Sequence, residues 1–448
     1  MQVQHRLIIR HPLQTAILLV NDNGEPRLPA FTSDDRHTAE VDYINAAVHE
    51  RFGLVTTVLR SLSHSDPRGD VVERMHELET HGGSVLRLNT LRWYERAELL
   101  SLPDGEDRSA IAEWLAGETA HRMVVDGREW TRPGWLDEAR SWIERSLRDT
   151  GLGSVREIVQ LRAWPSSCVL RVRAASGDCY FKAVPESLRR ECAVTGYLAH
   201  HFPDAVPRVI ATDPERRWLL MAACVGRTLG EVTDVALWER AVARYARLQT
   251  ACVPRVPELG ALGCTLRSLD ALAEAIGPLS YDTMTLRPGE PDGLSTAEIE
   301  RLQALVPSLR RQCAQLAACG IPFTLEHGDL WPENFLVDQD TCVIIDWEDV
   351  AVAHPFFSLA PLSVGLGIYQ SGLHSPAARD RLEHAYLAAC AEMAPPERLR
   401  TALHIAAPLS FIDMAVRYRH QPPSVVQLHP WMRDLVPQTL RLALACIP

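Results

Sequence analysis

The chain has 448 residues and a formal net charge of −11, and 46% of its residues are hydrophobic. This length suits two or three domains, and the composition is that of a globular protein with a large buried core. The acidic balance argues against a nucleic-acid partner, and no run of 18 uncharged apolar residues predicts a membrane span. The 11 cysteines include no CxxC pair, which indicates reduced thiols and a cytoplasmic protein.

Residues 1–125 are expected to form a small α+β domain. Apolar segments at 7–20 and 84–94 predict strands, and residues 39–62 predict a helix that ends at Gly53 and a strand after it. A helix is also expected at 109–117.

Four polar residues at 73–81 have a spacing that metal ligands also use. They are Glu73, His76, Glu79 and His81. We favour a polar helix end over a metal cluster for this segment.

The pattern changes after residue 125. Residues 126–150 are expected to be a linker and a lead-in helix from Trp135 to Leu147. Three short strands and a helix at 186–202 follow, and then a buried strand at 217–226. Residues 227–448 are expected to be mostly helical, with a capping box of Ser295 and Glu298 at the start of a helix that runs to about Cys319.

Two residues stand out against a strong compositional bias. Lys182, in the segment YFKAV, is the only lysine among 46 basic residues, and Asn334 is the only asparagine after Asn89. Such a bias replaces lysine by arginine wherever the two are equivalent. A lysine that remains therefore favours a chemical role over a solvated strand edge.

Residues 327–347 carry the groups that phosphoryl transfer requires. Asn334 follows Asp329 by five residues, and Asp346 ends the apolar strand 342–345. One carboxylate must accept the proton of the attacking hydroxyl, while a carboxylate and an amide oxygen hold Mg²⁺ on the phosphates. Each aspartate alone also suits a turn, but their order favours phosphoryl transfer.

The segment HGDLWPENFLV…IIDWEDV resembles the aminoglycoside phosphotransferase family of small-molecule kinases. The resemblance implies a protein-kinase-like bilobal fold, α+β in class, with a small lobe at 151–226 and a large helical lobe at 227–448. It implies that Asp329 is the catalytic base and that Asn334 and Asp346 bind Mg²⁺.

The same resemblance assigns the nucleotide site. It implies that Lys182 contacts the ATP phosphates and pairs with Glu191 on the following helix. It also places adenine against backbone groups of Met221, Ala222 and Ala223. The motifs do not distinguish ATP from GTP.

Two segments depart from the pattern of the family. Ser358 stands where the family often has an aspartate that braces the catalytic loop, and the phosphate-covering loop 163–168 lacks GxGxxG. In the N-terminal domain, AAVHERFGL resembles the end of a Nudix box, but Ala47 and Arg51 replace two of its acids. This suggests a Nudix-like domain without activity, and an unrelated small α+β domain fits the same residues.

The sequence therefore predicts an ATP- and Mg²⁺-dependent kinase that phosphorylates a hydroxyl of a small molecule. The alternative is a catalytically inactive kinase-like protein that binds nucleotide or ligand. A Nudix hydrolase with a silent kinase part is disfavoured by the degraded box. The acceptor and the oligomeric state are not encoded in any motif.

Overall fold

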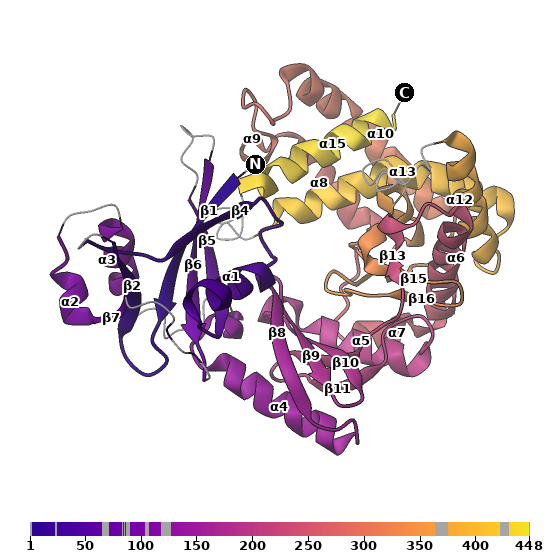
Figure 1. Cartoon of the computed structure of the whole chain (residues 1–448). Coiled ribbons are helices and arrows are strands. Elements are labelled where there is room, and N and C mark those ends of the chain that lie inside the picture. The colour runs from indigo at the N-terminus through magenta and orange to yellow at the C-terminus, as the bar shows by residue number, and fades with distance from the viewer. Residues whose placement is uncertain are drawn as a thin grey trace. The chain divides into compact units, whose positions relative to one another are not determined.

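The computed structural model describes residues 2–22, 25–64, 71–82, 84, 86, 90–103, 107–117, 127–362, 375–421 and 430–447. The chain forms two compact units (Figure 1). The first unit comprises residues 1–189 and 210–223, and the second comprises residues 190–209 and 224–448. The first is rich in sheet and the second in helix, so the predicted α+β class is confirmed. The domain limits at residues 125, 150 and 226 remain a prediction.

The N-terminal part of the first unit is built on a mixed seven-stranded sheet. Its central order is β3-β2-β1-β6-β5, with β4 paired to β1 and β7 to β2. The elements are β1 (Gln2–Arg10), β2 (Ala16–Asp22), β3 (Glu25–Arg27), β4 (Ala30–Asp34), α1 (Asp42–Phe52), β5 (Thr56–His64), β6 (Val71–Thr80), β7 (Leu91–Glu95), α2 (Arg96–Leu100) and α3 (Arg108–Gly117). The predicted helix before Gly53 is confirmed, and Gly53 caps it at φ 76°. Of the strand predicted at 84–94, the structure has β7, and residues 85 and 87–89 lie outside the described residues.

The polar helix end expected at 73–81 is wrong, because this segment forms strand β6. Successive side chains of a strand point to opposite faces, so Glu73 and Glu79 share one face and His76 lies on the other. Much of the strand is buried on both faces, and its buried polar groups have partners that offset the cost of burial. Arg10 and Arg60 bind the Glu77 carboxylate, and His76 hydrogen-bonds to His5 on the neighbouring strand β1.

The rest of the first unit is a five-stranded sheet covered by one helix. The strand order is β11-β12-β10-β9-β8. The elements are α4 (Trp135–Asp149), β8 (Val155–Ala163), β9 (Cys168–Ala174), β10 (Gly177–Ala183), β11 (Val209–Asp213) and β12 (Trp218–Ala222). Their core is aromatic: the ring of Phe181 packs against Trp135, Trp142 and Trp218. Because successive side chains of a strand point to opposite faces, Lys182 lies on the face of β10 opposite to the apolar side chain of Phe181.

The second unit has a mainly helical core with short strands. Its helices are α5 (Arg190–His201), α6 (Val235–Cys252), α7 (Val256–Ala261), α8 (Leu269–Ser280), α9 (Thr283–Leu286), α10 (Thr296–Ala318), α12 (Pro376–Ala389), α13 (Pro396–Arg419) and α15 (Leu435–Ala445). Its strands are β13 (Arg227–Thr228), β14 (Thr324–Glu326), β15 (Phe335–Val337), β16 (Cys342–Ile344) and β17 (Ala351–Ala353). The predicted capping box of Ser295 and Glu298 opens α10.

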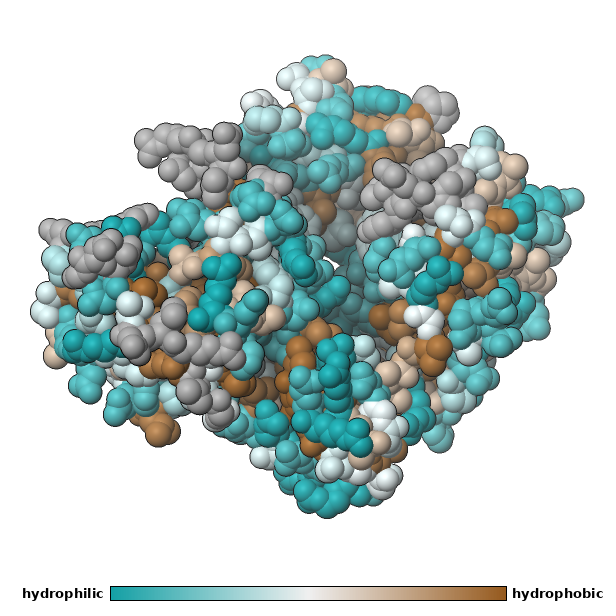
Figure 2. Space-filling view, viewed as in Figure 1, coloured by the Kyte–Doolittle hydropathy of each residue, from teal (hydrophilic) through white to brown (hydrophobic). Residues whose placement is uncertain are grey.

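Among the described helices, α13 alone is long and apolar enough to cross a membrane. Of its most apolar window, 67% is buried inside the protein, as is usual for a core helix. The face shown in Figure 2 carries hydrophilic residues over much of its area, with hydrophobic residues scattered among them. The cytoplasmic location remains a prediction.

Candidate active site

The loop after β14 carries the predicted catalytic aspartate. Gly328 adopts φ 83°, and a Cβ there would lie 2.4 Å from the carbonyl oxygen of Asp349. Only glycine fits such a close approach in the left-handed region. The tight turn at Gly328 follows directly from β14 and brings Asp329 to the start of the next segment.

His327 joins this loop to the segment that carries Asp346. Its Nε2 lies 2.9 Å from the carbonyl oxygen of Ile345, which can only accept, so Nε2 carries the proton. Its Nδ1 then accepts the N–H of Asp329 at 3.3 Å. The ring packs against Trp347 with centroids 4.5 Å apart. The imidazole of His327 thus joins the backbone of Asp329 to that of Ile345, the residue before Asp346.

Asn334 is tied back to the loop of Asp329. Its Nδ2 donates to the carbonyl oxygen of Asp329 at 2.7 Å and lies 3.5 Å from Oδ2 of the same residue. The backbone carbonyl oxygen of Asn334 accepts the N–H of Ile345 at 2.9 Å. Because the amide nitrogen serves the loop, the amide oxygen is the atom suited to a metal ion.

Three carboxylates of the second unit converge. The carboxylates of Glu191, Asp346 and Glu348 lie within 4.8 Å of one another. Asp346 adopts φ 68°, which is uncommon for a residue other than glycine. Oxygen donors of this kind fit Mg²⁺. Sequence reasoning missed Glu348, although it lies two residues after Asp346, and assigned Glu191 to Lys182 only.

Burial and, after it, the neighbouring carboxylates of Asp349 and Asp346 raise the pKa of Asp329 to about 7, although the guanidinium of Arg417 opposes them. Arg417 binds Asp349 and Asp413 through contacts of 3.2 Å each. A carboxylate with a pKa near neutrality is suited to accept a proton at physiological pH.

A buried group behind the loop was missed by sequence reasoning. Ser358 Oγ donates to Glu326 Oε1 at 2.5 Å, and the N–H of Gly328 donates to the same oxygen at 3.2 Å. The hydroxyl of Tyr245 lies 3.2 Å from Glu326 Oε2 and accepts the N–H of His327 at 3.0 Å. Glu326 directly precedes the HGD motif, but no local pattern separates it from an ordinary strand residue.

The predicted nucleotide residues other than Glu191 lie in the first unit. Lys182 is on β10, opposite Leu219 of β12, and only 6% of its surface is exposed. A lysine is rarely buried without a specific role. Met221 and Ala222 end β12, and the N–H of Ala223 donates to the carbonyl oxygen of Asp178 at 3.1 Å. The chain passes to the second unit after Ala223. Because Lys182 and Glu191 belong to different units, their ion pair stays a prediction.

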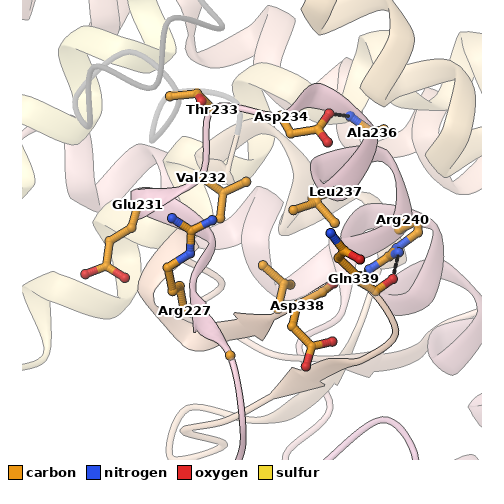
Figure 3. Close-up of a pocket in the computed structure, with 12 residues that line it drawn as sticks. Arg227, Glu231, Val232, Thr233, Asp234, Ala236, Leu237, Arg240, Asp338 and Gln339 are labelled. Atoms are coloured by element: carbon orange, nitrogen blue, oxygen red, sulfur yellow. Dashed lines mark hydrogen bonds between the residues drawn. The ribbon is translucent and has the colours of Figure 1, made fainter.

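A pocket of about 530 Å³ in the second unit is separate from these residues. Figure 3 shows it between the start of α6 and the ends of β13 and β15, with Arg227, Glu231 and Asp234 among its polar residues. Arg240 binds the carbonyl oxygens of Asp338 and Gln339. Its guanidinium therefore holds the turn after β15, and the residues that line the pocket include none of the predicted site residues.

Comparison with known proteins gives the class to which this fold and motif belong. The model of the phosphotransferase enzyme family (APH) matches residues 151–399, more than half of the chain. The chain therefore belongs to the phosphotransferase enzyme family, whose members are small-molecule phosphotransferases. The match begins after the N-terminal domain, and the Nudix-like resemblance is not confirmed. No curated protein matches the chain.

Solved structures include similar chains. A choline/ethanolamine kinase family protein from Mesorhizobium loti is 19% identical, with 70% of this chain and 94% of that chain covered and a TM-score of 0.47. A Plasmodium vivax ethanolamine kinase is 13% identical, with 78% and 95% covered and a TM-score of 0.46. A spectinomycin phosphotransferase in complex with ADP and spectinomycin is 12% identical, with 68% and 98% covered and a TM-score of 0.42.

Proposed function

We propose that the protein is an ATP- and Mg²⁺-dependent kinase that transfers the γ-phosphate to a hydroxyl of a small molecule. The observation that carries this proposal is the paired arrangement of Asp329 and Asn334 in one loop, with Ile345, the residue before Asp346, joined to that loop through His327. A proton acceptor and metal-binding oxygens are the parts that phosphoryl transfer needs from a protein.

In the proposed reaction the acceptor hydroxyl oxygen attacks the γ-phosphorus and the bond to the β,γ-bridging oxygen breaks. The hydroxyl proton passes to the carboxylate of Asp329, and ADP leaves. Asn334 and Asp346 would hold Mg²⁺, which neutralises phosphate charge when bound. Glu191 and Glu348 add carboxylates beside Asp346. Lys182 would position the phosphates, and backbone groups of residues 221–223 would face adenine.

The charges near Asp329 indicate the class of acceptor. Residues 353–448 contain six acids and eight arginines, whereas the whole chain is −11. Beside Asp329, Arg417 contacts both Asp349 and Asp413, and Arg267 contacts Asp413 at 3.2 Å. Two arginines thus balance two aspartates, so this ion-pair group adds no net negative charge beside Asp329 to attract a polycation. We propose a neutral, zwitterionic or anionic hydroxyl compound as acceptor.

A screen for ADP formation tests the proposed function. Wild-type protein is incubated with MgATP and separate sugars, amino alcohols, nucleosides and antibiotics, with Asp329→Asn as the control. Acceptor-dependent ADP formation that the control lacks supports the kinase. Binding of MgADP without turnover on any acceptor supports the inactive binding protein instead. Efficient phosphorylation of a polycationic antibiotic, with neutral sugars inert, contradicts the acceptor class.

A further inference from the structure

The N-terminal domain pairs with the last residues of β8. This strand is at the edge of its five-stranded sheet, and residues 39–41 of the N-terminal domain lie along its open side. The N–H of Val41 donates to the carbonyl oxygen of Leu161, and the N–H of Ala163 donates to that of Ala39, both at 3.0 Å. Covering an edge strand prevents unwanted pairing, but these residues also lie next to the turn between β8 and β9.

A side chain of β8 extends this pairing. Gln160 accepts the N–H of Val58 at 2.8 Å and donates to the carbonyl oxygen of the same residue at 2.9 Å. Its Oε1 also accepts from Asn45 at 3.2 Å. The register of β8 shifts beside Gln160, and the register of β5 shifts beside Val58. The amide therefore joins two irregular strands at a point where backbone pairing is interrupted.

The contacts continue into the turn between β8 and β9. Ala163 is buried in the core of the N-terminal domain, together with Val41 and Val58. The next residue, Trp164, packs against the ring of His37, with centroids 5.3 Å apart. Trp164 and Ser167 exchange backbone hydrogen bonds of 2.8 and 3.2 Å, which close the turn. The turn thus has one end in the N-terminal domain, while Cys168 enters the core of the five-stranded sheet.

We propose that the N-terminal domain is a positioning element for the turn Trp164–Ser167, and through this turn for the nucleotide. This inference rests on the proposed function, together with the family resemblance that makes residues 163–168 the loop over the ATP phosphates. A short turn without glycine cannot fold itself closely onto phosphates as a glycine-rich loop does. An external anchor at His37, Ala39 and Gln160 supplies the fixed geometry instead.

The test uses the exposed side chain of His37, so that the variants fold. His37→Ala removes the ring from Trp164, and His37→Phe keeps a ring there. His11→Ala is the matched control, because His11 packs against Trp93 of the same domain in a similar contact, with centroids 5.0 Å apart. MgADP affinity is measured by calorimetry, and hydrogen exchange is measured in peptides that span residues 160–170.

We expect His37→Ala to bind MgADP roughly three- to tenfold more weakly, the order expected for one lost aromatic contact. Exchange at 160–170 should rise in that variant. His37→Phe should stay within about twofold of the wild type, and His11→Ala should match it. Equal affinities for His37→Ala and His11→Ala overturn the inference. If the wild type binds neither MgADP nor MgATP, the proposed function fails and nucleotide positioning fails with it. Unchanged hydrogen exchange at residues 160–170 in His37→Ala would also overturn the inference, because it would show that His37 does not anchor the turn.

Discussion

The Ser358 hydroxyl donates a hydrogen bond of 2.5 Å to the carboxylate of Glu326 in the interior of the second unit. The family resemblance places a bracing aspartate at position 358, and this chain has its carboxylate at position 326. Glu326 accepts a hydrogen bond from the N–H of Gly328. It lies beside Tyr245, whose hydroxyl oxygen accepts a hydrogen bond from the N–H of His327. Burial raises the pKa of Glu326, while Arg267 and the bonds from Ser358 and Gly328 lower it. The carboxyl group that fixes the loop thus comes from the strand before it.

Glu326→Gln should therefore reduce turnover by about tenfold or more, because an amide group replaces an oxygen that accepts a buried hydrogen bond. Adding Ser358→Asp to this variant should restore much of the activity, since one carboxylate again lies in the group. Ser358→Asp alone should lower the melting temperature, because it buries two adjacent carboxylates. The control is Glu239→Gln, which affects an exposed pair with Arg381. An unchanged rate in Glu326→Gln would show that the loop needs no such brace.

Lys182→Arg should nearly abolish turnover, by at least about a hundredfold, and leave the fold intact. In the proposed site Lys182 contacts the phosphates from a buried strand position, where a planar guanidinium cannot take the place of a compact ammonium. The matched control is Arg173→Lys on the neighbouring strand β9, where Arg173 forms an exposed pair with Glu157 at 2.9 Å. Steady-state ADP formation and circular dichroism measure the two effects. Near-normal turnover in Lys182→Arg would remove this lysine from the site.

The two aspartates should differ in what their variants lose. Asp329→Asn removes the proposed proton acceptor, so transfer should fall by about 10² to 10⁴ while MgADP binding is largely kept. Asp346→Asn removes a proposed metal ligand, so it should weaken the Mg²⁺-dependent part of nucleotide binding. Titrations with MgADP, with and without EDTA, separate the roles. An equal loss of binding in both variants would contradict this division.

The value of kcat/KM should rise with pH around neutrality. Asp329 must be ionised to accept a proton, and burial with the carboxylates of Asp349 and Asp346 raises its pKa to about 7. Below that pH the protonated form dominates and activity falls. Asp349→Asn should move the midpoint to lower pH, because it removes the second cause of the raised pKa. A pH profile of kcat/KM that is flat from 6 to 8 would exclude Asp329 as the titrating base.

The local motifs could be predicted from sequence because their residues are close along the chain. Lys182 lies on a strand as expected, and the helix opened by Ser295 forms with its capping box. Strand β6 was missed although its partner β5 lies close along the chain, because its other partner β1 lies some 70 residues earlier and supplies Arg10 for the buried Glu77. Glu326 was missed for the same reason: its partners Tyr245 and Ser358 are 81 and 32 residues away.

The paired histidines of the N-terminal domain should make it sensitive to acid. His5 Nδ1 lies 2.9 Å from His76 Nε2, and the other ring nitrogens lie 3.0 Å from Ser33 Oγ and 2.9 Å from Ser61 Oγ. Burial lowers the pKa of His5 to about 4 and that of His76 to about 3. The unfolded chain therefore binds more protons than the folded one below pH 6.5. Stability is full above that pH and is lost as the pH falls toward these folded-state values.

At pH well below 6.5, each buried histidine should lower the free energy needed to open the sheet by about 1.4 kcal/mol for each unit that the pH falls. Hydrogen exchange in peptides from β1 and β6, corrected for the intrinsic rate, measures this slope between pH 5 and 8. His76→Gln should lower it by about one proton, because glutamine does not titrate. Ile9→Val, in the core of the same sheet, should reduce stability without changing the slope. The same slope in His76→Gln and wild type would show that His76 does not bind the proton that opens the sheet.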